Sequence, residues 1–122
     1  MNFNLTEEQR LLRKLYKEFT VNEVEPIAGE IDEEGRFPVE TVEKMKKNGM
    51  LGIPFPKKYG GQGGDNQAYI MLVEELSKAC GTTGVVVSAH TSLCCAPIYE
   101  FGTEEQKQKY LVPLAKGEKL GA

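Results

Sequence analysis

The only histidine of the chain, His90, is the residue best suited by type to move a proton. An imidazole titrates near neutral pH, so it can serve as a general base. A base needs a nucleophile or an orienting acid within hydrogen-bond reach, and none stands at a motif spacing from His90. We therefore predict that His90 is a buried residue bonded to a neighbouring helix.

The glycine-rich segment YGGQGGD, residues 59–65, has a composition that can also hold a phosphate group. It lacks the Gly-Lys-Ser/Thr sequence of a P-loop, and no strand is expected before it. Glycines also supply the positive φ angles of tight turns. We favour a turn over a phosphate site here.

Adjacent carboxylates and cysteines are the remaining reactive groups. The carboxylate pairs are Glu7 with Glu8, Glu74 with Glu75, and Glu104 with Glu105. Each pair falls on an expected helix, where a solvated surface accounts for it without catalysis. Three cysteines have neither disulfide nor metal-ligand spacing. We predict that the adjacent Cys94 and Cys95 are small buried thiols in a reducing cytosol, and we expect no metal site.

Composition allows one globular domain. The chain has 122 residues, of which 40% are hydrophobic and 27% are charged. A net charge of −3 and a pI near 5.3 argue against a nucleic-acid partner, because the lysines and arginines alternate with acids. The polar start MNFNLTEEQR has neither the apolar core of a signal peptide nor the composition of a transit peptide. We expect a cytoplasmic location.

The pattern of apolar residues is helical almost throughout and contains no convincing strand. Capping-box sequences begin at Thr6 and Thr103, and each has glutamine three residues later. In the first helix the apolar residues after Pro26 are shifted by one position, which predicts a kink or interruption there. We predict an all-α bundle of about five helices, over residues 6–34, 38–49, 66–81, 82–97 and 103–117. Residues 50–65 form a structured loop.

The helix that contains the segment 84–97 carries no charge over that length. It is apolar on nearly every side, which indicates a central buried helix, but it is too short and too polar to span a membrane. Along it, Ser88, Thr91, Ser92 and Cys95 form a stripe of small residues that predicts close packing against another helix. By residue types alone, the chain is a helical domain without a complete active site.

Five motifs in order carry a resemblance to a known family: LTEEQRLLRKLYKEF, DEEGRFP, LGIPFPKKYGGQGG, VSAHTSL and FGTEEQKQKYLVPLAKGEKLGA. Across all 122 residues the chain resembles the amino-terminal helical domain of the acyl-CoA dehydrogenases. It most resembles the short-chain (butyryl-CoA) enzymes of anaerobic bacteria. The family's middle β-domain and carboxy-terminal helical domain are expected to be absent from this chain.

The resemblance implies an activity for the longer protein. Members of the family use FAD to oxidise acyl-CoA thioesters to trans-2-enoyl-CoA and pass electrons to an electron-transferring flavoprotein. They assemble as homotetramers, so a homo-oligomer is expected. The catalytic glutamate lies in the carboxy-terminal domain, so this chain should have no catalytic residue, hold no FAD and be inactive alone.

The resemblance also places the acyl pocket. Matched position by position, the residues that line it are Val86, Ala89, His90 and Leu93. They are expected to share one face of the central helix, nearly opposite the small-residue stripe.

Two other functions fit the same residues. The chain could be a free-standing helical interaction module, or a domain of an acyl-CoA oxidase. A reading frame that continues past Ala122 into a β-rich flavin segment would favour a fragment over a module. We also expect the isolated chain to associate through the central helix and the 50–56 loop, with contacts at Leu93, Ile53 and Phe55, because both segments are unusually apolar.

Overall fold

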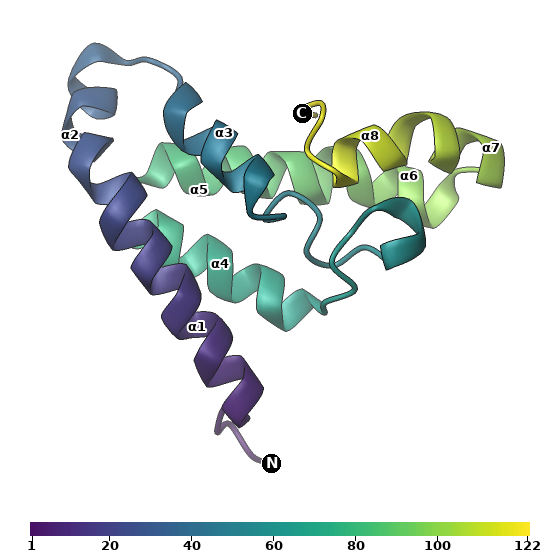
Figure 1. The fold of residues 1–122 in the computed structure, drawn as a ribbon, viewed down its shortest axis with the longest axis horizontal. Helices are drawn as coiled ribbons and strands as arrows, with labels where there is room; N and C mark the ends of the chain where they lie inside the picture. Colours follow the sequence, from purple (N-terminus) through teal and green to yellow (C-terminus); the bar gives the residue numbers. More distant parts are fainter.

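The computed structural model describes all 122 residues, and its elements are helices joined by loops (Figure 1). The first helix is continuous and consists of α1 (Glu7–Phe19), a π-helical turn (Thr20–Val24) and α2 (Glu25–Glu34). The second and third helices are α3 (Val39–Lys47) and α4 (Asn66–Ala79). The fourth helix consists of α5 (Gly81–Ser88), a π-helical turn (Ala89–Cys95) and α6 (Ala96–Phe101). The fifth helix consists of α7 (Glu104–Gln106), a π-helical turn (Lys107–Leu111) and α8 (Val112–Ala115). These five continuous helices confirm the predicted all-α fold.

Each of the three π-helical turns comes just before a proline. Pro26, Pro97 and Pro113 are each the second residue of the α-helix that follows. A proline lacks the N–H donor and its ring clashes with the carbonyl four residues back. The residue before each proline instead donates its N–H to the carbonyl five residues back, as Glu25 does to Thr20. Each helix therefore continues past its proline.

The wider turn explains the shift seen in the sequence of the first helix. A π-helical turn holds one more residue than the α-helical turn that it replaces. With that extra residue, Tyr16 and Thr20 before Pro26 and Ile31 after it all lie buried. The predicted interruption at Pro26 is wrong, because the π-helical turn absorbs the change of phase and lets one long helix bury residues on both sides of the proline.

Local signals set the helix ends as expected. Thr6 and Thr103 each accept a hydrogen bond from the backbone N–H three residues later, and both capping boxes are complete. The Asp65 side chain accepts from the Ala68 N–H at 2.8 Å and so caps α4. Gly35 ends α2 in the left-handed conformation, with φ of 62°.

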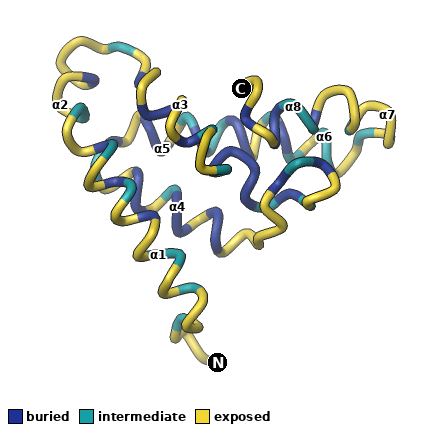
Figure 2. Tube along the Cα trace, in the orientation of Figure 1, coloured by how far each residue is buried: buried dark blue, intermediate teal, exposed yellow.

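The buried residues form two clusters rather than one. Figure 2 marks the buried residues in dark blue along the trace. The larger core has 15 buried residues, from α1 to α4 and the start of the 50–65 loop, and it includes Val87 of α5. The smaller core has six buried residues: Phe55, Tyr59, Cys95, Leu111, Leu114 and Ala115. The helix made of α5 and α6 therefore contributes to both cores.

The loop between α3 and α4 passes from one core to the other. Met50 to Ile53 belong to the larger core, whereas Phe55 and Tyr59 belong to the smaller one. A short 3₁₀-helix, Lys57–Tyr59, lies within the loop. Only 5% of Ile53 and 3% of Phe55 are exposed. The prediction that this loop supplies an exposed apolar surface for association is wrong, because its apolar side chains fill the interior of the domain.

Candidate functional site

The candidate site lies on the fourth helix, which consists of α5, a π-helical turn and α6 and runs along the long axis of the molecule (Figure 1). α5 packs closely on α4, since a Cβ on Gly84 would collide with the Ser77 side chain of α4. The small-residue stripe faces the same neighbour. Tyr69 of α4 has its hydroxyl 2.8 Å from the Ser92 hydroxyl and 3.5 Å from the Ser88 carbonyl oxygen. Of the stripe, Ser88 and Ser92 thus meet α4 as predicted, whereas Cys95 packs in the smaller core with the loop and the fifth helix.

The four residues expected to line an acyl pocket differ widely in exposure. Val86 is half-buried against the larger core, and Ala89 is also half-buried. His90 is completely buried, whereas 71% of Leu93 is exposed. Leu93 is therefore the accessible member of this set, Val86 and Ala89 are partly accessible, and His90 is buried inside the domain.

Both ring nitrogens of His90 have backbone partners. Nε2 lies 3.0 Å from the Leu51 carbonyl oxygen, and Nδ1 accepts a hydrogen bond from the Gly121 N–H at 3.0 Å. Since Nδ1 accepts, the proton of the neutral ring must sit on Nε2 and be donated to Leu51. His90 is buried and fully bonded, as predicted, but its partners lie in a loop and in the carboxyl-terminal segment rather than in a helix.

Burial sets the protonation of this region. It lowers the pKa of His90 below its ordinary value of 6.5, and the nearby Lys46 charge acts in the same direction. The hydrogen bond to the Leu51 carbonyl and the nearby Leu114 backbone act in the opposite direction and raise the pKa of His90. Burial also raises the pKa of the Cys95 thiol to about 12, so Cys95 is a thiol at neutral pH and not a nucleophile. Cys95 is buried as predicted, while Cys94 is only half-buried.

The glycine-rich loop is a turn, as predicted. Gly60 and Gly63 have φ angles of 86° and 68°, which favour glycine. The backbone N–H groups of residues 61–64 donate to carbonyls of residues 52–56, at distances of 2.8 to 3.1 Å. Because these donors are directed into the loop itself, they do not form a phosphate cradle.

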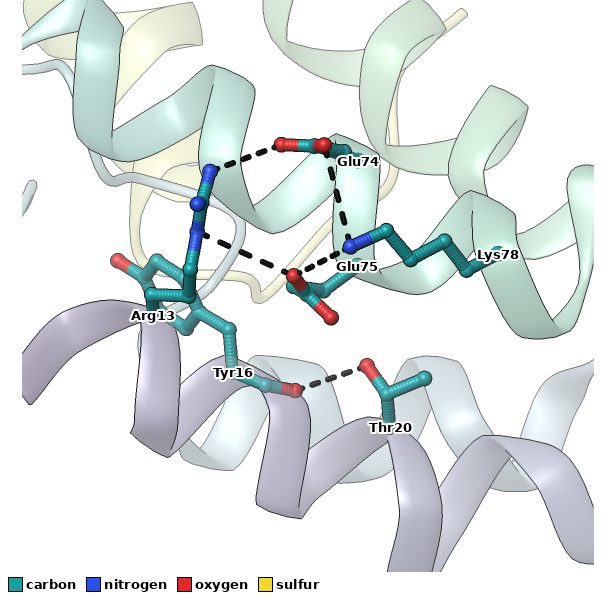
Figure 3. A network of polar contacts seen from close by, with 6 residues as sticks. All are labelled: Arg13, Tyr16, Thr20, Glu74, Glu75 and Lys78. Carbon is teal, nitrogen blue, oxygen red and sulfur yellow. Dashed lines mark hydrogen bonds and ion pairs between the residues drawn. The ribbon is translucent and has the colours of Figure 1, made fainter. Parts of the chain in front are cut away.

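One of the carboxylate pairs is not solvated as predicted. Glu75 of α4 is buried, and its carboxylate lies 2.9 Å from Lys78 Nζ and 4.0 Å from Arg13 Nε of α1 (Figure 3). Its neighbour Glu74 binds Arg13 at 3.0 Å from the exposed side. A buried carboxylate needs such partners. The prediction failed because Arg13 is 62 residues away in sequence, so no local pattern links it to Glu75.

Glu104 also has a specific partner. Its carboxylate accepts a hydrogen bond at 2.6 Å from the hydroxyl of Tyr59, which lies in the 50–65 loop. This bond lowers the pKa of Glu104. It ties the start of the fifth helix to the loop, so the role of Glu104 is structural.

A hollow of about 750 Å³ lies between α1, the end of α3 and the loop, and sequence reasoning did not detect it. Its apolar lining includes Leu12, Phe19, Met50 and Ile53. None of the four predicted pocket residues lines it. Its residues come from segments far apart in the chain, so only the fold brings them together.

Two kinds of site are absent from the structure. No three His, Cys, Asp or Glu side chains gather in a way that could hold a metal ion. None of the helices has both the length and the apolar character that crossing a membrane requires.

Known proteins match this chain closely. The family model of the acyl-CoA dehydrogenase N-terminal domain matches residues 6–118. The short-chain specific acyl-CoA dehydrogenase of Clostridium acetobutylicum is 69% identical over all 122 residues, which make up 32% of that protein.

Solved structures agree. The butyryl-CoA dehydrogenase of Megasphaera elsdenii matches with a TM-score of 0.92 and 43% identity, over 100% of this chain and 33% of that one. A chain from a structure described as the electron transferring flavoprotein of Acidaminococcus fermentans matches with a TM-score of 0.93 and 47% identity, over 98% of this chain and 32% of that one. The chain thus spans about a third of the length of these relatives. With its helices, its caps and nearly its whole length matched, the chain belongs to the acyl-CoA dehydrogenase family, as an amino-terminal domain of it.

Proposed function

We propose that this chain is the amino-terminal domain of a short-chain acyl-CoA dehydrogenase and supplies part of the wall of its acyl pocket. The observation that carries the proposal is the accessible apolar surface at Ala89 and Leu93, on a helix that is otherwise largely buried. Val86 and His90 support this wall from behind. The similarity to short-chain and butyryl-CoA enzymes favours a small acyl group as the substrate.

The proposed reaction is removal of hydrogen from the α and β carbons of a short acyl-CoA, which gives a trans-2-enoyl-CoA. Proton abstraction requires a positioned base. His90 does not provide one, because both of its nitrogens are bonded to backbone groups inside the domain. From the resemblance to the family, we assign the catalytic carboxylate to the longer protein and expect the chain alone to be inactive.

FAD is the cofactor of the proposed enzyme. The glycine-rich loop of this chain offers no free N–H groups to the phosphates of FAD, since residues 61–64 donate to the loop's own carbonyls. We therefore assign flavin binding to the longer protein and expect no flavin absorbance from this chain after desalting. An electron-transferring flavoprotein is the proposed electron acceptor, in keeping with the structure from Acidaminococcus fermentans. We also propose that the longer enzyme is a homo-oligomer and is located in the cytoplasm.

The test is to narrow the acyl wall in the longer enzyme. Ala89→Leu adds bulk at the accessible wall, so it should reduce kcat/KM for hexanoyl-CoA about 10- to 200-fold more than for butyryl-CoA, since blocking one methylene costs that much. The matched control is Thr82→Leu, which adds similar bulk at an exposed position at the start of the same helix. It should leave the ratio of the two kcat/KM values unchanged.

Equal losses on both substrates in Ala89→Leu would show that this face is not the acyl wall. A longer protein without acyl-CoA dehydrogenase activity would contradict the proposed function itself.

A further inference from the structure

His90 connects three segments that are distant in sequence. It lies on the helix between Val87, which belongs to the larger core, and Cys95, which belongs to the smaller one. Through its two nitrogens it bonds Leu51 of the 50–65 loop and Gly121 of the carboxyl-terminal segment. The single buried imidazole therefore sits where both cores, the loop and the terminal segment meet.

We propose that His90 is a positioning residue, whose ring holds the segment 119–122 against the helix of the acyl wall. The inference rests on the proposed function, because it concerns the wall of the acyl pocket. It says that His90 fixes the position of this wall relative to residues 119–122. His90 stands next to Ala89 in sequence, so a shift of the ring would displace the wall as well. It is not a catalytic residue, since it has no free nitrogen to offer a substrate.

The packing around Gly121 leaves little freedom for another arrangement. A Cβ on Gly121 would collide with the Cys94 side chain and come within 3.2 Å of Leu114. The terminal segment therefore lies directly on the central helix and on α8. Gly117, two residues before this segment, has a φ angle of 79° and packs on Lys46 of α3. The His90 bond to Gly121 fixes the far end of a segment that is held at both ends.

This bond requires a neutral ring. A second proton would occupy Nδ1 and place an N–H donor against the Gly121 N–H. The groups that face the ring are Lys46 from α3, the Cys95 thiol from its own helix, and the backbone of Leu51 and Leu114. Protonation would thus add a positive charge near Lys46 and break the link to the terminal segment.

Two substitutions separate the two bonds. In His90→Asn, the side-chain oxygen lies near the position of Nδ1 and can accept from Gly121, while the bond to Leu51 is lost. In His90→Gln, the side-chain amide nitrogen lies near the position of Nε2 and can donate to Leu51, while Gly121 loses its acceptor. The two variants are therefore matched controls for each other.

The measurement is amide hydrogen exchange at Gly121 in the 122-residue chain, followed by NMR at pH 7.5. Exchange should be about tenfold faster in His90→Gln than in the wild type, which is the change expected for one lost hydrogen bond. In His90→Asn it should stay close to the wild-type rate. Equal rates in all three proteins would overturn the proposal.

The wild type offers a second test that does not depend on the variants folding. The chain has one histidine, so its imidazole signals are assigned without ambiguity. As pH falls below 6.5, protection of Gly121 should be lost with the same midpoint as the imidazole titration. A midpoint that follows carboxylate titration instead would contradict the proposal.

Kinetics of the longer enzyme connect this link to the reaction. His90→Gln should have a lower kcat/KM for butyryl-CoA than the wild type. His90→Asn, which keeps an acceptor for the Gly121 N–H, should have a kcat/KM close to that of the wild type. If Gly121 responds as expected and kcat/KM is the same in both variants, then the placement of the wall does not depend on His90. If no dehydrogenase activity exists at all, the proposed function fails while the exchange result still stands.

Discussion

The hydroxyl of Thr91 is the one buried hydroxyl group in the protein that has no hydrogen-bond partner. Thr91 is only 3% exposed and lies one residue after His90, in a π-helical turn. A second buried threonine, Thr20, lies in another π-helical turn and donates its hydroxyl to the Tyr16 carbonyl oxygen at 2.8 Å. The two residues differ mainly in whether the hydroxyl is bonded.

We predict opposite effects on stability when each of these threonines is replaced by valine. Thr91→Val removes a buried hydroxyl without a partner, so the free energy of unfolding should rise by about 1 kcal/mol. Thr20→Val removes the hydrogen bond to the Tyr16 carbonyl and should lower the free energy of unfolding by about 1 kcal/mol. Urea denaturation of the two variants checks this. A loss of stability in Thr91→Val would mean that its hydroxyl is bonded in solution.

At the scale of elements, the contact between the 50–65 loop and α8 depends on Gly52. A Cβ on Gly52 would run into the Ala115 carbonyl oxygen and come within 3.2 Å of Gly61. These neighbours are backbone atoms, so they cannot move aside as a flexible side chain would. Gly29 of α2 is the contrasting case, because nothing lies within 4 Å of its Cβ position.

Gly52→Ala should therefore lower the free energy of unfolding by about 1–3 kcal/mol, as overpacking does in a close-packed interior. Gly29→Ala adds the same methyl group in the open interior of a helix and should raise the free energy of unfolding by about 0.5–1 kcal/mol. Chemical denaturation of both variants gives the comparison. Similar effects of the two substitutions would refute the proposed contact between the loop and α8.

Sequence predicted the elements well because their signals are local. Both capping boxes, the glycine turn and the change of phase at Pro26 depend on residues within about one or two turns of one another. The end of the fourth helix is the exception, because the sequence predicts an end at Pro97 and the helix instead continues to Phe101.

Predictions about the site were weaker because its contacts are long-range. Glu75 pairs with the local Lys78 but also with Arg13 of α1, 62 residues away, and His90 bonds Gly121 at a separation of 31 residues. The burial of Ile53 and Phe55 likewise depends on how the loop packs between the two cores. Apolar composition alone does not show whether a segment faces inward or outward.

At the scale of the whole molecule, apolar side chains remain exposed on several helices, among them Leu11 of α1 and Ile70 of α4, and three of the most exposed lie on one helix. Val85 is 65% exposed, Leu93 71% and Phe101 88%, and all three lie on the α5–α6 helix. Exposed apolar patches of a few hundred Å² promote association. Since the 50–65 loop is internal, we expect the contact between isolated chains to involve the α5–α6 helix rather than that loop.

The 122-residue chain should be at least dimeric at micromolar concentration, and Leu93→Lys should shift it towards the monomer. Ile70→Lys is the matched control, because Ile70 is 57% exposed on α4, away from this helix. Size-exclusion chromatography with light scattering over a range of concentrations measures the mass. A monomer throughout, or the same shift in both variants, would be evidence against this surface.

The division of the interior into cores of 15 and six buried residues bears on how the molecule unfolds. Little apolar area holds α7 and α8 in place, so this end should form a separate cooperative unit that opens at a lower free energy than the rest. Such an opening would release the 103–122 region to proteases while helices α1 to α4 remain folded. The α5–α6 helix crosses both units, so it would lose the packing of its second half and keep that of its first.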